Sequence, residues 1–264
     1  MKKLYDEARK IIIKIGSSTL TSENGEIDYE FLQNLADQVY EIINDKKQVV
    51  IVSSGARIAG ISSTGKWSRK EDINYKQALC AIGQVELMNA YKKTFIEKGF
   101  HIGQLLLTRG DFETPKRNLN IRNTLFTLID ENVIPVVNEN DTVSVEEIRI
   151  GDNDMLAART AVLWGADITI LLSDIDGIYD KNPKEYKDAK LIEQIENIFE
   201  YEKNIDTSGK SSFGTGGMAT KIEAAKLVNT YGSTLIITKG KQKDAILKTL
   251  RGEIKSTIIT SPTK

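Results

Sequence analysis

Two lysines beside glycine-rich segments are the residues of this 264-residue chain whose type and spacing point most directly to chemistry. Lys14 interrupts an apolar segment just before Gly16, and Lys221 ends the segment 214–221, which reads GTGGMATK. Backbone N–H groups of glycine loops and helix N-termini bind phosphate oxygens, and a neighbouring ammonium group adds the opposite charge. Each lysine also has an ordinary interpretation as a solvated side chain at the end of an element. Together the two lysines indicate a phosphate-binding site.

Short polar side chains form a second group of candidates, in the segments 138–141 (NEND) and 151–154 (GDND). The second segment opens a predicted helix, where a single Asp or Asn suffices as the N-cap. The other side chains are therefore available to orient an ammonium group, the lysines or a magnesium-bound phosphate. They could instead bind a hard cation such as Mg²⁺ directly, because carboxylate and amide oxygens suit such an ion.

Several other kinds of site are excluded by composition and spacing. The chain has one histidine, His101, and one cysteine, Cys80, which rules out two-histidine zinc motifs and a disulfide framework. The segment 214–221 is neither a Walker A loop, because Ile222 follows its lysine, nor a dinucleotide fingerprint, which would follow the first strand. A net charge of 36 − 37 = −1 argues against an electrostatic nucleic-acid binder. We predict structural roles for both residues, with Cys80 buried in the core on the inward face of its helix and His101 at the start of a strand.

The elements that must position these residues alternate between short apolar strands and longer helices. Strands are predicted at 10–15, 49–52, 101–107, 133–137, 167–172, 234–238 and 257–259. Helices are predicted at 28–44 with Asp28 as N-cap, 72–98, 115–130, 153–164, 216–231 and 244–250, and an edge hairpin at 143–150. In the helix 72–98, apolar residues recur at helical spacing and predict the inner face: Ala78, Ala81, Ile82, Val85, Met88, Tyr91 and Phe95. The alternation predicts an α/β fold with a mostly parallel sheet covered on both faces.

Polar loops follow five of these strands. They contain Gly16-Ser17, Ser53-Ser54-Gly55, the segment 138–141, Ser173-Asp174 and the segment 238–240. Each loop has the composition of an ordinary turn. Ligands of open α/β sheets bind at the carboxyl ends of the strands, so five such loops at one edge favour a shared site.

Lysines and aspartates next to glycine loops suit phosphoryl transfer, which depends mainly on positioning and charge neutralisation. The motifs contain no evident general base. A carboxylate acceptor needs none, because its pKa of about 4 leaves it ionised at neutral pH. These residues therefore favour a kinase that forms an acyl phosphate.

The same motifs resemble those of the amino-acid kinase family over nearly the whole chain. The resemblance rests on the segments 14–18 (KIGSS), 52–56 (VSSGA), 103–108 (GQLLLT), 138–141, 151–154 and 214–221. The first is typical of the whole family, whereas the last three resemble the members that act on glutamate. The implied fold is a three-layer αβα sandwich with a mostly parallel central sheet. The implied reaction is ATP-dependent phosphorylation of the γ-carboxylate of L-glutamate, the first step of proline biosynthesis.

The resemblance also implies a role for individual residues. Lys14 and Lys221 would neutralise the transferring phosphoryl group, and Asp154 would orient them. Ser54, Asp141 and Asn153 would bind glutamate. Magnesium would bridge the phosphates of ATP without a direct protein ligand. ATP itself would contact Lys14, Gly16, Ser17, Ser173, Asp174, Thr215, Gly216, Gly217, Met218, Ala219, Thr220 and Lys221.

The organisation expected is one domain, 1–264, with a glutamate-binding lobe over about 1–166 and an ATP-binding lobe over about 167–264. Many family members carry a further C-terminal domain of an RNA-binding type, which is not expected here because the sequence stops at Lys264. The resemblance implies a homo-oligomer inhibited by L-proline. With no signal peptide and no apolar segment of membrane length, we expect a cytoplasmic protein without membrane or nucleic-acid partners.

Three alternatives to this function remain. Acetylglutamate, uridylate and carbamate kinases are expected to share the fold, and the segments 138–141 and 151–154 argue against them. A non-catalytic amino-acid or nucleotide sensor is disfavoured by the presence of both lysines and Asp154. A nicotinamide-dependent oxidoreductase is disfavoured because the dinucleotide fingerprint is missing.

Overall fold

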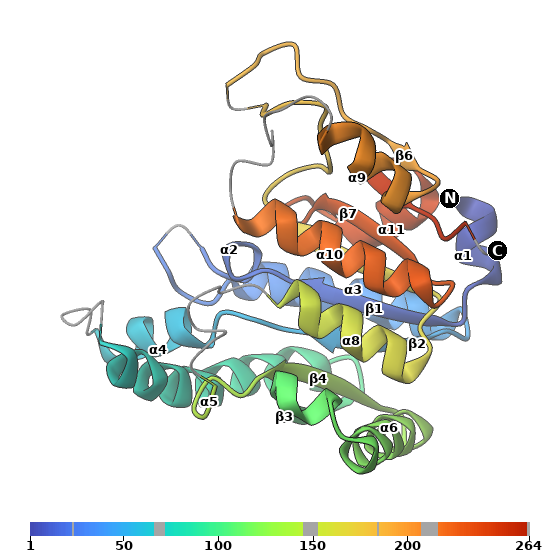
Figure 1. Ribbon diagram of the computed structural model, residues 1–264. Helices are drawn as coiled ribbons and strands as arrows, with labels where there is room; N and C mark the ends of the chain where they lie inside the picture. The colour runs from blue at the N-terminus through green and yellow to red at the C-terminus, as the bar shows by residue number, and fades with distance from the viewer. Residues whose placement is uncertain (23, 66–71, 145–152, 184, 207–215, 263–264) are drawn as a thin grey trace.

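The computed structural model describes residues 1–22, 24–65, 72–144, 153–183, 185–206 and 216–262. A central sheet lies between two layers of helices, with α8 (Asp154–Trp164) and α10 (Gly216–Thr230) in front of it in Figure 1. The predicted three-layer α/β fold is thereby confirmed. Within the described residues, no helix is both long and apolar enough to cross a membrane.

The sheet has eight strands in the order β3-β4-β2-β1-β5-β7-β8-β6 among the described residues. The strands are β1 (Lys10–Ile15), β2 (Gln48–Val52), β3 (His101–Leu107), β4 (Val133–Glu139), β5 (Ile168–Ser173), β6 (Gln194–Ile195), β7 (Thr234–Lys239) and β8 (Ser256–Ile259). Neighbouring strands are parallel except β7 and β8, so the sheet is mostly parallel as predicted. β1 lies at the centre, between β2 and β5, and its carboxyl end therefore faces loops from both halves of the chain.

The remaining elements are helical. They are α1 (Lys2–Glu7), α2 (Ser17–Leu20), α3 (Tyr29–Asn44), α4 (Ala56–Thr64), α5 (Ile73–Ile96), the 3₁₀ turn η1 (Arg109–Phe112), α6 (Pro115–Asp130), α9 (Ile198–Asp206) and α11 (Ala245–Arg251). The predicted N-cap is confirmed at α3, where an Asp28 carboxylate oxygen accepts a hydrogen bond from the Phe31 N–H at 2.9 Å. The short helices α2 and α4 were not predicted. They begin directly after Gly16 and Gly55, where the sequence indicated loops.

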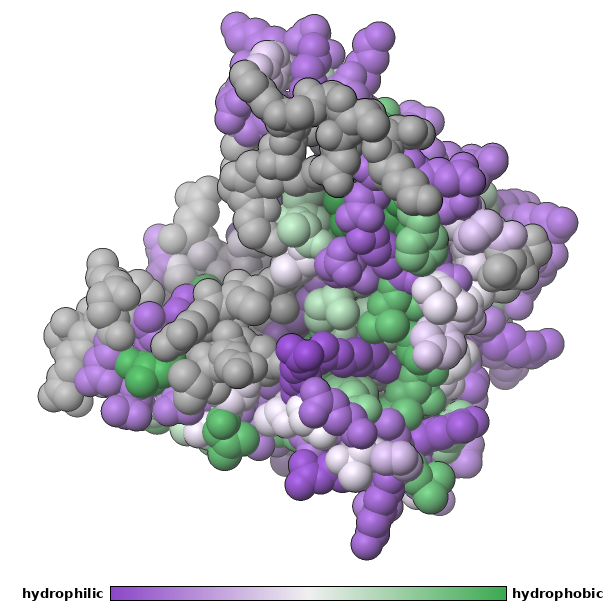
Figure 2. Space-filling model, in the orientation of Figure 1, coloured by the Kyte–Doolittle hydropathy of each residue, from purple (hydrophilic) through white to green (hydrophobic). Residues whose placement is uncertain are grey.

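The two faces of the sheet carry separate hydrophobic cores. On one face α3, α5 and α11 pack on alternate strand residues such as Ile11 and Ile13, and on the other α6, α8 and α10 cover residues such as Ile12. Successive side chains of a strand point to opposite faces, so Lys14 lies on the same face as Ile12. The alternation thus directs Lys14 toward α8 and α10. Figure 2 shows this side of the molecule, with hydrophilic residues around its rim and a band of hydrophobic residues over α8 and α10.

The inner face of α5 agrees with the predicted one at Tyr91 and Phe95, which are fully buried, and differs from it in the first half of the helix. Ile82 and Val85 are exposed at 41% and 60%, whereas Leu79, Cys80 and Leu87 are buried. The physical reason is α4, which the sequence pattern did not reveal and which packs along α5. A Cβ atom on Gly83 of α5 would overlap the carbonyl oxygen of Ala56 in α4, so a glycine is required for this close approach.

This contact gives a first prediction. We expect Gly83→Ala to lower the free energy of unfolding by about 1–3 kcal/mol, the usual cost of forcing a methyl group into a packed contact. Urea denaturation measures the change. The matched control is Gly110→Ala, whose added methyl group would meet only Thr108 Oγ1, at 3.8 Å. Equal stability of the Gly83 variant and the wild type would contradict the close contact between α4 and α5.

Candidate active site

Three buried charged residues meet at the carboxyl end of β1. Lys14 Nζ lies 2.6 Å from Asp154 Oδ1, and Lys221 Nζ lies 2.8 Å from Asp154 Oδ2. The side chain of Asp154 is fully buried, and the side chains of Lys14 and Lys221 are exposed by only 6% and 9%. The structure therefore brings the three predicted catalytic residues into one cluster, although 207 positions separate the two lysines in sequence (221 − 14 = 207).

Each member of this cluster is held by a different element. Lys14 projects from β1, Asp154 is the first residue of α8, and Lys221 lies in the second turn of α10. Lys221 Nζ also donates to the carbonyl oxygen of Gly217 at 3.2 Å. Buried charges are stable only when they are paired, and among these three residues two ammonium groups face one carboxylate. The cluster is therefore suited to an anionic group.

A relay of amide side chains joins this cluster to α5. Asn153, the N-cap residue of α8, donates through Nδ2 to the Ser53 carbonyl oxygen at 2.7 Å and to Asn138 Oδ1 at 2.8 Å. Asn138 Nδ2 in turn donates to Gln84 Oε1 at 2.7 Å. These bonds fix the position of Asn153 directly beside Asp154.

The relay also explains a correction to the predicted elements. β4 was expected to end at Val137, but it continues through Glu139, and Asn138 and Glu139 are buried. Both residues pair with β3, Asn138 opposite Leu106 and Glu139 opposite Leu107. The polar side chain of Asn138 is tolerated inside the sheet because its amide is hydrogen-bonded at both ends.

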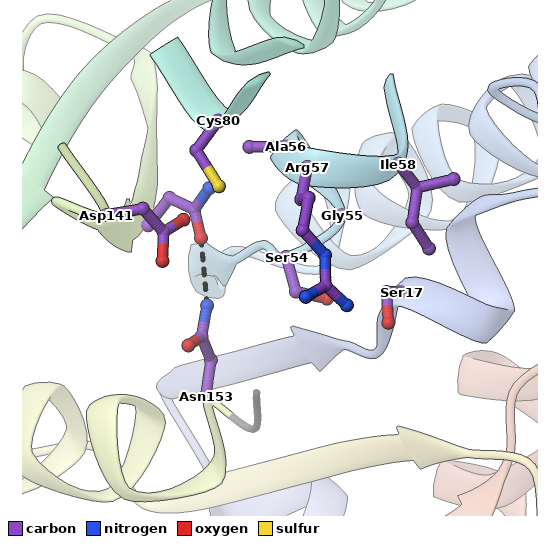
Figure 3. A pocket seen from close by; sticks show the side chains of 10 residues that line it. Ser17, Ser54, Gly55, Ala56, Arg57, Ile58, Cys80, Asp141 and Asn153 are labelled. Atoms are coloured by element: carbon purple, nitrogen blue, oxygen red, sulfur yellow. Dashed lines mark hydrogen bonds between the residues drawn. The ribbon is translucent and has the colours of Figure 1, made fainter. Parts of the chain in front are cut away.

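A pocket opens beside the charged cluster, and Figure 3 shows the side chains that line it. The lining includes Ser54, Asp141 and Asn153, the three predicted glutamate-binding residues. The complete set of described lining residues is Ser17, Ser54, Gly55, Ala56, Arg57, Ile58, Cys80, Asn138, Asp141 and Asn153. Ser54 is held in place because its hydroxyl group donates to the Ile15 carbonyl oxygen at 2.7 Å. Ser17, which was expected to contact ATP, lines the same pocket.

Cys80 forms part of the pocket wall beside Asp141 (Figure 3). Its side chain is buried, as predicted. Burial, the negative charge of Asp141 and a hydrogen bond to that carboxylate raise the pKa of the Cys80 thiol to about 12, and the positive charge of Arg57 partly opposes them. The thiol is therefore protonated at neutral pH and is no nucleophile. His101, by contrast, lies exposed at the start of the edge strand β3 and is absent from the described pocket lining.

The raised pKa of Cys80 gives a second prediction. At pH 8, a thiol with a pKa of about 12 is ionised to only about one part in 10⁴, so iodoacetamide should react far more slowly with the native protein than with the urea-unfolded one. Well below the pKa, the thiolate fraction rises tenfold for each pH unit. The alkylation rate of the native protein should therefore also rise tenfold for each pH unit between 8 and 10. Thiol titration over time measures the rate, and fast native alkylation at pH 8 would contradict the raised pKa.

The residues expected to hold ATP lie on several elements. Ser173 ends β5 and donates through Oγ to Asp174 Oδ1 at 3.1 Å, and the Ser173 carbonyl oxygen accepts from the Gly240 N–H at 2.8 Å. The Gly16 N–H donates to the Leu172 carbonyl oxygen at 3.4 Å. The phosphate contacts of Gly16 and Ser17 stay predictions, and Ser17 begins the short helix α2.

The glycine cluster supplies the start of α10. Gly216, Gly217, Met218, Ala219 and Thr220 form its first residues, and Thr220 Oγ1 lies 3.5 Å from Asp154 Oδ2. Thr215 lies outside the described residues, as do positions 145–152 of the predicted edge hairpin and of the GDND segment.

Arg57 and Gln84 are two site residues that the sequence reasoning missed. Arg57 is the second residue of the unpredicted helix α4, and its side chain enters the pocket. Gln84 lies one turn of α5 after Cys80 and is buried. The glycines and alanines at positions 55, 56, 59 and 60 are the sequence signal for a close helix contact there.

Comparison with known proteins agrees with this geometry. The model of the amino acid kinase family matches residues 9–239. The chain therefore belongs to the amino acid kinase family. Its curated relatives include the Glutamate 5-kinase of Alkaliphilus oremlandii, 60% identical over 258 residues that cover 98% of each chain. The Glutamate 5-kinase of Clostridium acetobutylicum is 42% identical and covers 100% of this chain and 98% of its own.

Solved structures support the same fold. The UMP kinase of Ureaplasma parvum superposes with a TM-score of 0.68 at 20% sequence identity, covering 96% of this chain and 99% of that one. At this level of identity the likeness concerns the architecture alone.

Proposed function

We propose that the chain transfers the γ-phosphoryl group of ATP to the γ-carboxylate of L-glutamate and forms L-glutamyl 5-phosphate. The observation that carries the proposal is the Lys14–Asp154–Lys221 cluster, placed directly beside a pocket that contains Asp141 and Asn153. An anion-binding cluster next to a pocket with one carboxylate suits a substrate with one ammonium group and a reactive carboxylate. The name of the relatives identifies glutamate as that substrate.

In this reaction an oxygen of the ionised γ-carboxylate attacks the γ-phosphorus of ATP. The new O–P bond forms while the bond from that phosphorus to the bridging oxygen breaks, and ADP leaves with the electron pair. Lys14 and Lys221 neutralise the charge of the phosphoryl oxygens in transit. Asp154 holds both ammonium groups in position through its two oxygens. No proton has to be removed from the acceptor, so no general base is needed.

Magnesium would enter with ATP in this scheme. Both oxygens of Asp154 are occupied by lysines, so the donors at the cluster fit phosphate oxygens rather than a metal ion. The ion would be held by the nucleotide phosphates themselves, where it neutralises part of their charge. Ser17, Ser173, Asp174 and the start of α10 would contact the rest of the nucleotide.

The test of this function is trapping of the product. Purified protein with ATP, Mg²⁺ and L-glutamate should release ADP, and added hydroxylamine should yield γ-glutamyl hydroxamate. Omission of glutamate serves as the control. Turnover of N-acetylglutamate or of a nucleoside monophosphate, with none of glutamate, would overturn the proposal.

Inhibition by L-proline is a third prediction. Proline has the α-carboxylate and a cationic amine, so it can occupy the places of those groups near Asp141 and Asn153, but it has no second carboxylate to present to the lysines. We expect inhibition that glutamate relieves and that Asp141→Ala weakens. Initial rates at several glutamate concentrations measure this effect with proline in the millimolar range. Unchanged rates at sub-saturating glutamate would refute a shared site.

The remaining features of the proposal concern organisation. We propose a cytoplasmic homo-oligomer with a glutamate-binding lobe over about 1–166 and an ATP-binding lobe over about 167–264. The exposed side chains of Ile82 and Val85 on α5 support self-association, because large apolar side chains on one helix face favour a protein contact. Light scattering at several protein concentrations tests this part.

A further inference from the structure

Arg57 is the cationic side chain of the described pocket lining, and the proposed mechanism leaves it without a task. Figure 3 shows its guanidinium group reaching from α4 toward Ser54 and Ser17, whereas Asp141 and Cys80 lie on the other side of the pocket. Among the described residues, no ion pair or hydrogen bond holds this guanidinium group. Its five N–H donors are therefore available to a ligand.

The backbone around Arg57 favours an anion as well. Gly55, the N-cap residue of α4, has a φ of 87° and offers no side chain to cap the N–H groups of the first turn. Gly55, Ala56, Arg57 and Ile58 all line the pocket, so the positive end of the helix faces it. The helix and the guanidinium group thus act on the same region.

The described lining of the pocket carries one negative and one positive side chain, on opposite sides. Asp141 on one side is suited to an ammonium group, and Arg57 on the other side is suited to a carboxylate. These are the two charged groups on the α-carbon of a zwitterionic amino acid. In the proposed reaction the γ-carboxylate of glutamate points to the phosphoryl group between Lys14 and Lys221, which leaves the α-carboxylate for Arg57.

We propose that Arg57 is a specificity-determining residue whose guanidinium group binds the α-carboxylate of the amino-acid substrate. This inference rests on the proposed function, because it assumes that glutamate occupies this pocket. Arginine suits the task because its planar group can donate two parallel hydrogen bonds to a carboxylate. Together Arg57 and Asp141 would select an α-amino acid over a simple dicarboxylic acid or an amine.

The experiment compares Arg57→Gln with the wild type on two substrates. L-Isoglutamine keeps the ammonium group and the γ-carboxylate of glutamate but carries an uncharged amide in place of the α-carboxylate. For Arg57→Gln we expect the KM for glutamate to rise about 10- to 100-fold, the usual effect of losing a charged hydrogen bond. The KM for ATP and kcat should stay within about threefold of wild type. The preference for glutamate over isoglutamine, measured as a ratio of kcat/KM, should fall by a similar factor as the KM for glutamate rises.

Two further variants sharpen the result. Arg57→Lys keeps the charge but loses the planar fork, so its KM for glutamate should lie between those of the wild type and Arg57→Gln. Arg251→Gln is the matched control, because it also removes one arginine but only breaks an exposed contact of 3.3 Å with Glu41. Its kinetic constants should equal those of the wild type. Circular dichroism confirms that each variant is folded.

The outcomes separate the two proposals. A wild type without glutamate-dependent ADP release would overturn the proposed function, and the role of Arg57 with it. An active wild type whose preference for glutamate over isoglutamine is unchanged in Arg57→Gln would overturn the role of Arg57 alone. In a third outcome, kcat falls or the KM for ATP rises while the KM for glutamate is unchanged. The guanidinium group would then contact the phosphates, and the proposed role of Arg57 would also be overturned.

Discussion

Lys14→Ala and Lys221→Ala are each expected to lower kcat by about 10²- to 10³-fold, because a preorganised charge at a transferring group contributes about 3–4 kcal/mol to transition-state stabilisation. Both ammonium groups are nearly buried, so solvent cannot replace the lost charge as it could at an exposed site. Each single variant leaves Asp154 paired with the other lysine. The protein should therefore stay folded while the reaction slows. Steady-state rates at saturating ATP and glutamate measure the effect.

The control for this prediction comes from the same helix as Lys221. Lys226 lies five residues further along α10 and contacts Glu202 and Glu223 at 2.6 and 2.8 Å. Lys226→Ala removes an equal charge outside the cluster and should leave kcat near the wild-type value. A kcat for Lys14→Ala or Lys221→Ala close to that of Lys226→Ala would show that the cluster does not act on the phosphoryl group.

The second large effect is expected at the carboxylate between the two lysines. Asp154→Asn keeps the shape of the side chain but removes the charge that compensates both ammonium groups. Breaking a buried ion pair from one side costs about 3–5 kcal/mol, because an uncompensated charge stays buried. We therefore expect a large fall in the free energy of unfolding, together with a kcat reduced at least as much as in the single lysine variants. Urea denaturation and steady-state kinetics measure the two effects.

An exposed ion pair provides the matched control for Asp154→Asn. Asp188 contacts Lys181 at 2.6 Å, but the Asp188 side chain is 77% exposed. Such pairs contribute about 0–1 kcal/mol, so Asp188→Asn should be nearly as stable as the wild type. Polyphosphate added to Asp154→Asn should recover part of the lost stability, because an anion can then compensate the lysines. Equal stability of the two Asp→Asn variants would contradict the burial of the cluster.

Much of this architecture follows from local sequence. The strands β1 and β3 were predicted with their observed ends, because the mostly apolar segments 10–15 and 101–107 are bounded by polar or glycine-containing segments. α6 was likewise predicted from 115 to 130, with proline in its first turn. The placement of Lys14, Asp154 and Lys221 at element ends on one edge also followed from the sequence, since parallel strands direct their carboxyl ends to the same side.

The tertiary structure alone decided how these ends meet. Lys14 reaches Asp154 because β5 pairs with β1. The paired residues are 157 positions apart (168 − 11 = 157), a contact that no local periodicity encodes. The part of the pocket wall that α4 forms could not be predicted from the sequence either. α4 has a weak apolar pattern and an internal glycine, so its sequence does not predict a helix. Close contacts at Gly60 and Gly83 hold it against α5. These contacts bury Gln84 and bring Arg57 to the pocket, because the side of a helix that becomes buried depends on which distant element packs against it.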